Sequence, residues 1–271
     1  MSANLLDCLV NGEISRHVPV TDRGLQYGDG LFETLLVRAG VPRFWQLHVD
    51  RLATGCEVLG IETVPQSLLL REVQTVSAGL AECVVKIIIT RGSSGRGYAP
   101  GDAAQPCRVV SSHPCPDDLA TASRRGVKAR ICNLRLGVQP ALAGIKHLNR
   151  LEQVLASAES NDAQMGEGIL LDIEDHVISA IKGNIFLVSG ERLLTPRMDR
   201  CGVRGVMRAA ILKAFKPRCE QRRITLDMLP EADEVFVCNA VRGVVPVNSI
   251  GHWEYPGNSR TREIQDWLER Q

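Results

Sequence analysis

The segment AGIKHLNRLEQVLA, residues 143–156, contains one lysine just before a helix-like pattern. Apolar residues recur there at helical spacing and predict a helix with one face in a core: Leu148, Leu151, Val154 and Leu155. Most lysines are solvated surface charges, and that reading stays open for Lys146. However, the helix dipole and partial burial both disfavour an ammonium at this place. A neutral lysine amine is the nucleophile that forms a Schiff base.

The composition is that of a globular enzyme-sized protein. The chain has 271 residues, of which 44% are hydrophobic and 23% charged. The formal net charge is +1 and the sequence pI is about 7.6, so no basic field attracts nucleic acid or anionic lipid. We therefore expect a small-molecule substrate, no nucleic-acid partner and no membrane partner.

The nine cysteines are odd in number and scattered, which favours a reducing, cytoplasmic compartment. The start of the chain lacks the pattern of a secretory signal, and no apolar run is long enough to cross a membrane. The six histidines do not form a metal-binding pattern, and we expect no metal. We interpret the cysteines as buried apolar residues rather than nucleophiles.

Two pattern-rich halves flank a polar segment with two prolines, residues 113–126. This predicts an N-terminal α+β domain over 1–113, a linker over 114–125 and a C-terminal α+β domain over 126–271. A hairpin is expected around Asn11-Gly12. Helices are expected at 45–59, 203–215 and 261–271, and strands at 84–90, 107–112 and 126–134. The segments 166–173, 176–180 and 184–196 are expected to give strands joined by tight turns, and 234–247 a strand and turn.

The lysine segment resembles the active-site segment of the 4-amino-4-deoxychorismate lyase family, a branch of the pyridoxal-phosphate-dependent class-IV aminotransferases. The similarity extends over nearly the whole chain, in LVNG, TDRGLQYGDGLFET, HVDRL, TRGSSGRGY, GNIFLV, LLTP, GVRGVMR and EADEVFVCNAVRGVVPV. The lysine segment and TRGSSGRGY are specific to the lyase branch. The other motifs also occur in branched-chain and D-amino acid aminotransferases.

This resemblance implies a two-domain class-IV aminotransferase (D-amino acid aminotransferase-like) fold with pyridoxal 5′-phosphate in the interdomain cleft, and a homodimer. It implies a folate-biosynthesis reaction that converts 4-amino-4-deoxychorismate to 4-aminobenzoate and pyruvate. Lys146 would hold the cofactor and act as base and acid, and Thr34 matches an active-site threonine of the lyases. The implied cofactor-binding residues are Arg51 at the phosphate, the amides of Gly205, Val206, Met207 and Ala240, and Ser179 and Asn184.

The glycine-rich stretch RGSSGRGY has three readings. It is a weak match to a nucleotide-binding loop, because its glycines lack the informative order before a helix. It is also compatible with a plain flexible connection. By the resemblance, Arg96 and Tyr98 would recognise substrate carboxylate together with Tyr27, and this is the reading that we favour.

One position departs from the family pattern. A glutamate five residues before the asparagine of the NIF segment usually pairs with the pyridine nitrogen, and here that position is Ser179. Glu174 and Asp175 are too far upstream to replace it. A hydroxyl holds a protonated ring less well, so the electron sink should be weaker. The alternatives to a lyase are a D-amino acid or branched-chain-type aminotransferase of the same fold, against which the missing glutamate argues, and a non-catalytic cofactor-binding protein, which Ser179 keeps open.

Overall fold

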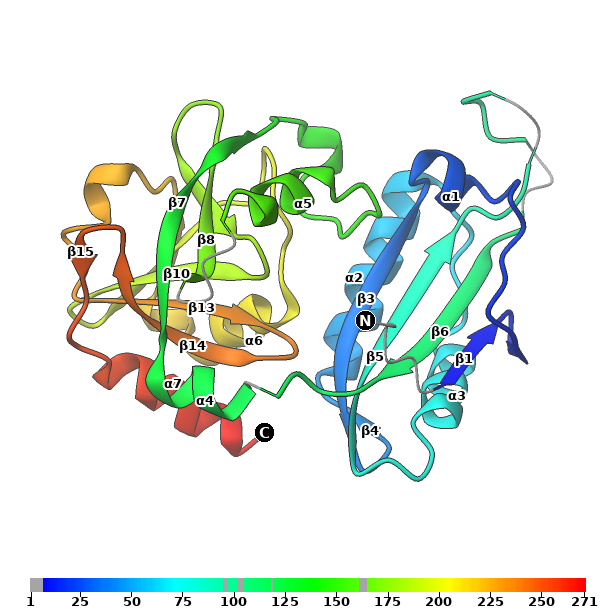
Figure 1. Cartoon of the computed structure of the whole chain (residues 1–271), viewed down its shortest axis with the longest axis horizontal. Helices are drawn as coiled ribbons and strands as arrows, with labels where there is room; N and C mark the ends of the chain where they lie inside the picture. The colour runs from blue at the N-terminus through cyan, green and yellow to red at the C-terminus, as the bar shows by residue number, and fades with distance from the viewer. Residues whose placement is uncertain (1–6, 95–96, 102–104, 118, 161–164) are drawn as a thin grey trace. The chain divides into compact units, whose positions relative to one another are not determined.

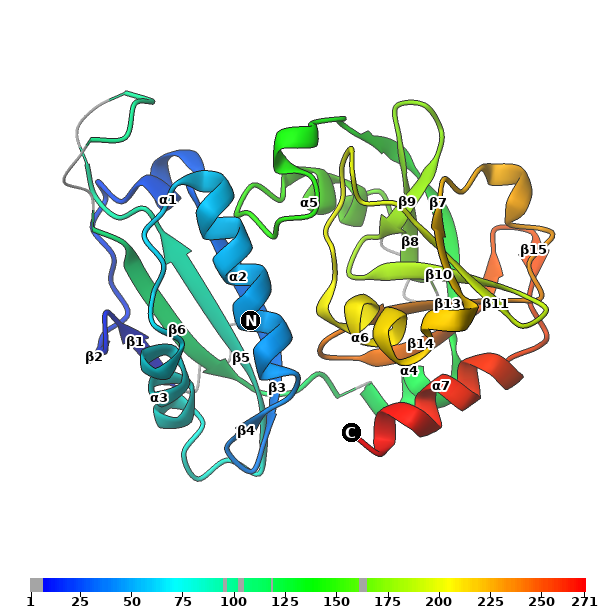
Figure 2. The ribbon, with the colours of Figure 1, turned by 180° about the vertical axis from the view of Figure 1, so that it is seen from behind.

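The computed structural model describes residues 7–94, 97–101, 105–117, 119–160 and 165–271. They belong to two compact units, shown in Figures 1 and 2: Met1–Pro116 with Ile145–Asn149, and Asp117–Gly144 with Arg150–Gln271. The lysine segment thus belongs to unit 1, although the chain on either side of it belongs to unit 2. The segment expected as a linker also contains a short helix, α4 (Leu119–Arg125).

Unit 1 is a six-stranded sheet in the order β2-β1-β6-β5-β3-β4. Its strands are β1 (Asp7–Val10), β2 (Glu13–Ile14), β3 (Gly30–Arg38), β4 (Val41–Pro42), β5 (Glu82–Thr90) and β6 (Cys107–His113). Its helices are α1 (Arg23–Tyr27), α2 (Trp45–Leu59) and α3 (Gln66–Val76). Helices α2 and α3 lie on one face of the sheet (Figure 2). The hairpin at Asn11-Gly12, the 45–59 helix and the strands at 84–90 and 107–112 are confirmed.

Alternation along β3 decides which residues meet α2. Leu31, Glu33 and Leu35 are buried and point to one face, and Phe32 and Thr34 point to the other. A Cβ atom on Gly55 of α2 would lie 2.7 Å from Leu31, so the helix approaches the sheet closely where glycine is present. Glu33 therefore lies on the face that α2 covers.

Unit 2 contains a nine-stranded sheet in the order β12-β11-β10-β13-β14-β7-β8-β9, with β15 paired to β14. The strands are β7 (Val127–Leu136), β8 (Met165–Asp172), β9 (Val177–Ala180), β10 (Asn184–Ser189), β11 (Arg192–Pro196), β12 (Cys219–Arg222), β13 (Glu234–Asn239), β14 (Gly243–Ile250) and β15 (Trp253–Glu254). Besides α4, the helices are α5 (Leu151–Ala158), α6 (Val206–Ala214) and α7 (Ser259–Glu269), with short 3-10 turns η1 (Pro140–Leu142), η2 (Lys216–Arg218) and η3 (Leu226–Met228).

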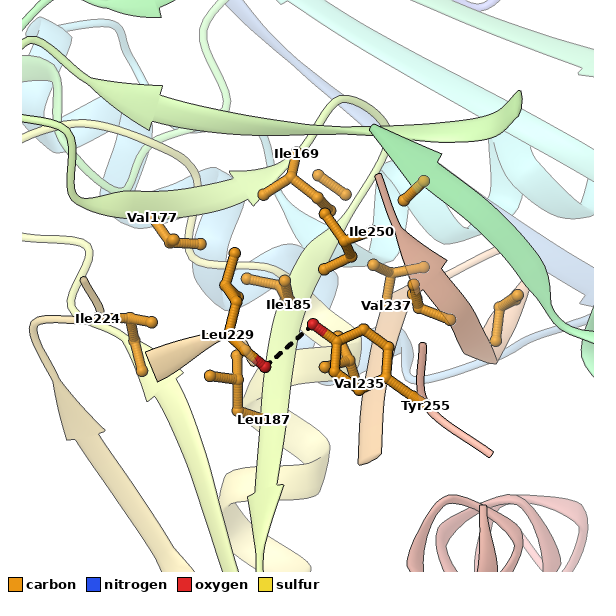
Figure 3. Packing of buried hydrophobic residues seen from close by; sticks show 14 of the residues in the cluster. Ile169, Val177, Ile185, Leu187, Ile224, Leu229, Val235, Val237, Ile250 and Tyr255 are labelled. Atoms are coloured by element: carbon orange, nitrogen blue, oxygen red, sulfur yellow. Dashed lines mark hydrogen bonds between the residues drawn. The ribbon is translucent and has the colours of Figure 1, made fainter. Parts of the chain in front are cut away.

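The unit 2 sheet curls around an aliphatic core, shown in Figure 3. Strand β9 contacts β10 and β11 as well as its ladder partner β8, so residues from both ends of the sheet meet. The cluster includes the buried aromatic residue Tyr255, whose hydroxyl donates a 3.0 Å hydrogen bond to the carbonyl oxygen of Leu229. Burial raises the pKa of Tyr255 to about 12. The helices expected at 203–215 and 261–271 and the strands expected at 126–134, 166–173 and 176–180 are confirmed, with small differences at their ends. The segment 184–196 forms two strands joined by a turn, as expected, and 234–247 adds a second strand, β14, to the expected strand and turn.

The prediction for the helix after the lysine was wrong in one respect. Helix α5 begins at Leu151, and its apolar residues are exposed rather than buried: Leu151 (75%), Val154 (59%) and Leu155 (59%). Ala156 is the buried member of the helix and joins a smaller core with Leu170 and Ile178. Lys146 also lies five residues before α5, and a helix dipole acts mainly within the first turn. The dipole argument therefore does not apply to Lys146.

The nine cysteines all carry free thiols, and seven of them are buried. Burial raises the pKa of several thiols, to about 12 for Cys201 and Cys238. Thiols with a raised pKa are poor nucleophiles. The expected burial is confirmed for seven of the nine cysteines, and Cys115 and Cys219 are only partly buried. Among the described residues, no helix is both long and apolar enough to span a membrane.

Candidate functional site

The segment around Lys146 is attached to the beginning of β3 by backbone hydrogen bonds. The amide of Phe32 donates to the carbonyl of Lys146 (3.0 Å), and the amide of Leu148 donates to the carbonyl of Gly30 (2.9 Å). Leu31 and His147 form an antiparallel bridge, and the Asn149 side chain donates to the Gly28 carbonyl at 3.2 Å. The lysine therefore sits on extended backbone paired to the unit 1 sheet.

The Lys146 side chain lies against an aromatic ring. Its Nζ is 4.1 Å from the centroid of Phe32, and Lys146 is half-buried. A second ammonium, Lys86 Nζ, lies 5.2 Å from the same centroid. Thr34 is directly opposite Lys86 in the β3–β5 register, so both point to the face that carries Phe32. Lys86 was not predicted as a site residue, because its position opposite Thr34 depends on strand pairing that the sequence pattern did not reveal.

The chain up to Gly144, two residues before Lys146, belongs to unit 2. The Gly144 amide donates to the Gly202 carbonyl (2.9 Å), and the Arg204 amide donates to the Gly144 carbonyl (3.0 Å). Gly144 has a positive φ of 89°, which favours glycine, and an added Cβ would lie 2.9 Å from the Arg204 side chain. The segment 202–204 leads directly into α6.

Arg51 lies on α2 and forms two hydrogen bonds with the buried carboxylate of Glu33. Arg51 Nε donates to Glu33 Oε1 (2.8 Å), and Nη2 donates to Oε2 (2.5 Å). His48, one helical turn earlier, contacts Glu33 Oε2 through Nδ1 at 2.6 Å. The Arg51 side chain is only 13% exposed, so Arg51 is not a solvent-facing charge.

In unit 2, Asn184 organises the entry to α6. Its side-chain nitrogen donates to the Val203 carbonyl (2.9 Å), and its side-chain oxygen accepts from the Gly205 amide (3.0 Å). Helix α6 starts at Val206, and the preceding Gly205 provides no side-chain cap. Val206 and Met207 are buried, so their side chains cannot meet a ligand and their backbone amides are the relevant groups. A helix N-terminus of this kind suits an anion.

Ala240 follows β13 in a turn that Asn239 stabilises. The Asn239 side-chain oxygen accepts from the amides of Val241 (3.0 Å) and Arg242 (2.7 Å), and its nitrogen donates to the Lys182 carbonyl (3.1 Å). Asn239 therefore determines the conformation of the backbone at Ala240.

Ser179 lies on β9 opposite Leu170 and is buried. The two acidic residues upstream have other partners: Glu174 pairs with Arg200, and Asp175 pairs with Arg135 at 2.7 Å. Both carboxylates are exposed, in agreement with the interpretation that neither replaces the missing glutamate.

The proposed substrate residues are placed only in part. The rings of Tyr27 and Tyr98 lie 5.6 Å apart, and Tyr98 is 86% exposed. The buried Arg23 donates to the carbonyls of Gly97 (2.9 Å) and Tyr98 (2.8 Å), so it holds this loop. Arg96 lies outside the described residues. No group of three or more potential metal ligands occurs within the described ranges.

The family follows from comparison with known proteins. Residues 30–250 match the family described as amino-transferase class IV, and the chain belongs to that family. Its members bind pyridoxal phosphate.

The chain can also be compared with individual members of known function or structure. The chain is 37% identical over 268 residues to an aminodeoxychorismate lyase of Vibrio harveyi, covering 94% of this chain and 97% of the relative. The crystal structure of the 4-amino-4-deoxychorismate lyase of Pseudomonas aeruginosa superposes with a TM-score of 0.93 at 42% identity, covering 97% and 98% of the two chains. A hypothetical aminotransferase of Mycobacterium tuberculosis in its PLP-bound form gives a TM-score of 0.85 at 20% identity, covering 97% of each chain, which shows the shared fold alone.

We expect Gly205→Ala to destabilise unit 2 by about 1–3 kcal/mol. The backbone φ of −66° at Gly205 suits alanine, but the added Cβ would lie 2.0 Å from the Asn184 side-chain oxygen. Urea denaturation of the full chain measures the free energy of unfolding. Gly137→Ala is the matched control, because its Cβ would meet only the Glu152 carboxylate, at 3.5 Å. If the two variants are equally stable, the Asn184–Gly205 contact does not exclude a side chain at position 205.

Proposed function

We propose that the protein is a pyridoxal-phosphate-dependent aminodeoxychorismate lyase that converts 4-amino-4-deoxychorismate to 4-aminobenzoate and pyruvate. The observation that carries this conclusion is the 37–42% identity to aminodeoxychorismate lyases over nearly the whole chain. The aminotransferase match at 20% identity supports only the fold. The nine free thiols fit the cytoplasmic location that we also propose.

The residues present fit pyridoxal phosphate. The phosphate needs anion-binding groups, and α6 offers the amides of Val206 and Met207 at an N-terminus without a side-chain cap. An added Cβ at Gly205 would collide with Asn184, so this position has room for the backbone but not for a side chain. In unit 1, Arg51 is our proposed phosphate-binding side chain; in unit 2, we propose the amide of Ala240 as a phosphate contact and Ser179 and Asn184 as further cofactor-binding residues.

When bound, pyridoxal phosphate supplies an aldehyde that captures the substrate amine and a ring that accepts the electron pair left by proton loss. Lys146 then has a neutral amine and removes the proton from the ring carbon that bears the substrate nitrogen. The same Nζ next delivers a proton to the enolpyruvyl group as its ether bond breaks. The six-membered ring becomes aromatic, and the released fragment becomes pyruvate. The hydrogen bonds to β3 keep the Lys146 backbone in place during both transfers.

The substrate carries two carboxylates, and unit 1 offers cationic and hydroxyl groups for them. Lys86 adds positive charge beside Phe32, where Lys146 also lies. Thr34 adds a hydroxyl on the same strand face. Arg96, Tyr98 and Tyr27 remain our proposed contacts for a substrate carboxylate, with Arg23 anchoring their loop through its backbone.

Lys146→Ala should abolish formation of 4-aminobenzoate, with a loss of about 10³-fold or more, because no other group replaces the amine that moves both protons. The assay supplies enzymatically generated aminodeoxychorismate to the purified full chain and follows 4-aminobenzoate. Lys213→Ala removes an exposed lysine of α6 and serves as control. A parent protein that binds the cofactor but forms no product would contradict the lyase function and direct attention to amino-group exchange with a 2-oxo acid.

Ser179 suits a lyase better than an aminotransferase. A hydroxyl cannot hold the pyridine nitrogen protonated as a carboxylate does, so electrons left on the cofactor are stabilised less. The lyase reaction gains from formation of an aromatic product, whereas transamination must store the electrons on the cofactor. The weaker sink is therefore tolerable in lysis.

Accordingly, Ser179→Glu should raise transamination activity at least about tenfold and leave lysis unchanged, because a carboxylate opposite the ring nitrogen strengthens the electron sink. Both rates are measured on the same preparation, one with a 2-oxo acid acceptor and one by 4-aminobenzoate release. Ser189→Glu, at an exposed position of β10, is the control. A collapse of lysis in Ser179→Glu alone would contradict the proposal.

We further propose a homodimer. The exposed apolar face of α5, made of Leu151, Val154 and Leu155, is a surface that a second copy of the chain can cover. Clustered exposed apolar side chains favour association because their burial removes apolar area from water.

Leu155→Glu should shift the protein from a dimer to a monomer of 29.7 kDa, measured by light scattering after size exclusion. A buried unpaired carboxylate opposes association at that face. Val58→Glu, at an isolated exposed valine of α2, should leave the dimer intact. A parent protein that is monomeric at all concentrations would exclude the homodimer.

A further inference from the structure

The carboxylate of Glu33 is buried in unit 1, beneath α2. The Glu33 side chain is 1% exposed, and so is that of His48. Glu33 Oε2 contacts both His48 Nδ1 and Arg51 Nη2, and Glu33 Oε1 accepts from Arg51 Nε. Burying a carboxylate away from water is costly unless charged and hydrogen-bonding partners stabilise it. The three contacts that converge on Glu33 therefore call for a functional explanation.

The contacts have a defined direction because Glu33 is ionised. Burial alone would raise its pKa, but the Arg51 charge and the hydrogen bonds from His48 and Arg51 lower it to about 2. An ionised carboxylate only accepts hydrogen bonds, so the His48 proton must be on Nδ1. His48 Nε2 is buried and has no hydrogen-bond partner in the described part of the chain. The one described hydrogen-bonding function of the His48 ring is therefore to hold Glu33.

Glu33 in turn fixes Arg51. Nε and Nη2 lie on one edge of the planar guanidinium, and both donate to the same carboxylate. Two parallel bonds determine the plane of the group and hence the direction in which Nη1 points. Without them, the long arginine side chain would occupy several rotamers and lose more entropy when an anion binds.

We infer that Glu33 and His48 are positioning residues that orient Arg51 toward the phosphate of the cofactor. The inference deepens the proposed function and rests on the assignment of Arg51 to that phosphate. Neither residue touches the cofactor: His48 holds Glu33, Glu33 holds Arg51, and Arg51 binds the anion. A purely structural ion pair would stabilise unit 1 without distinguishing phosphorylated from unphosphorylated ligands.

The test compares pyridoxal 5′-phosphate with pyridoxal, which lacks the phosphate, by absorbance titration of the apo full-length chain. Glu33→Gln should weaken binding of pyridoxal 5′-phosphate about tenfold and leave pyridoxal binding unchanged. Arg51→Ala should weaken the phosphorylated ligand more, about 100-fold. The double variant should bind no more weakly than Arg51→Ala alone. His48→Phe should show a smaller effect of the same kind.

A matched control exists in the same unit. Glu72 of α3 is also buried, and it accepts from Arg108 Nε (3.1 Å) and Nη2 (2.9 Å). Glu72→Gln should lower the thermal stability of the apo protein but leave the ratio of the two affinities unchanged. If Glu33→Gln prevents folding, Glu33→Asp retains the charge, shortens the reach by one methylene and should still weaken only the phosphorylated ligand.

The phosphate role of Arg51 and the positioning role of Glu33 are contradicted by different results. If Arg51→Ala leaves the affinity for pyridoxal 5′-phosphate unchanged, the phosphate role of Arg51 is wrong. If Arg51→Ala weakens it but the Glu33 variants do not, or weaken both ligands equally, that role stands and the positioning role is wrong.

Discussion

The backbone pairing of the Lys146 segment with β3 is the constraint on which the candidate site depends. Ile145–Asn149 belongs to unit 1, whereas Gly144 and Arg150 belong to unit 2. The chain thus leaves unit 2, pairs with Gly30 and Phe32, and returns. Because the hydrogen bonds use only backbone atoms, the lysine side chain is not needed to hold its own segment in place. The backbone of Lys146 therefore stays fixed during the proton transfers that we propose for its Nζ.

Buried charge in unit 1 is arranged around the same strand. Glu33 lies in the middle of β3, and Asp29 immediately precedes the strand. Asp29 accepts hydrogen bonds from Arg23 (2.8 Å) and Arg91 (2.7 Å). Burial opposes ionisation of Asp29, but the bonds and charges of the two arginines lower its pKa. Both carboxylates therefore stay ionised at neutral pH: Glu33 binds Arg51, and Asp29 binds Arg23, which holds the loop at Gly97 and Tyr98.

The spacing of apolar residues predicted the helices and strands, but not which of their faces are buried. The 45–59 helix was recognised because its apolar residues pack within its own unit, on β3. The same reasoning failed for α5, because an apolar stripe shows only that a surface avoids water and does not say what covers it. Similarly, the pair of Glu33 and Arg51 joins a strand and a helix 18 positions apart, and no local pattern reports such a contact. Family resemblance identified Arg51, and only the structure identified its partners.

The two kinds of proposed cofactor contact tolerate substitution differently. The proposed phosphate contacts of Gly205, Val206, Met207 and Ala240 use backbone amides, so the side chain at position 240 can change while the turn held by Asn239 persists. At the pyridine nitrogen the contact depends on a side chain, and replacing a carboxylate by the Ser179 hydroxyl changes its charge. A change of that kind alters which reactions the cofactor supports without altering how it is held. Divergence of activity on this scaffold is therefore expected at the ring nitrogen and substrate groups, with the phosphate cup and the lysine pairing preserved.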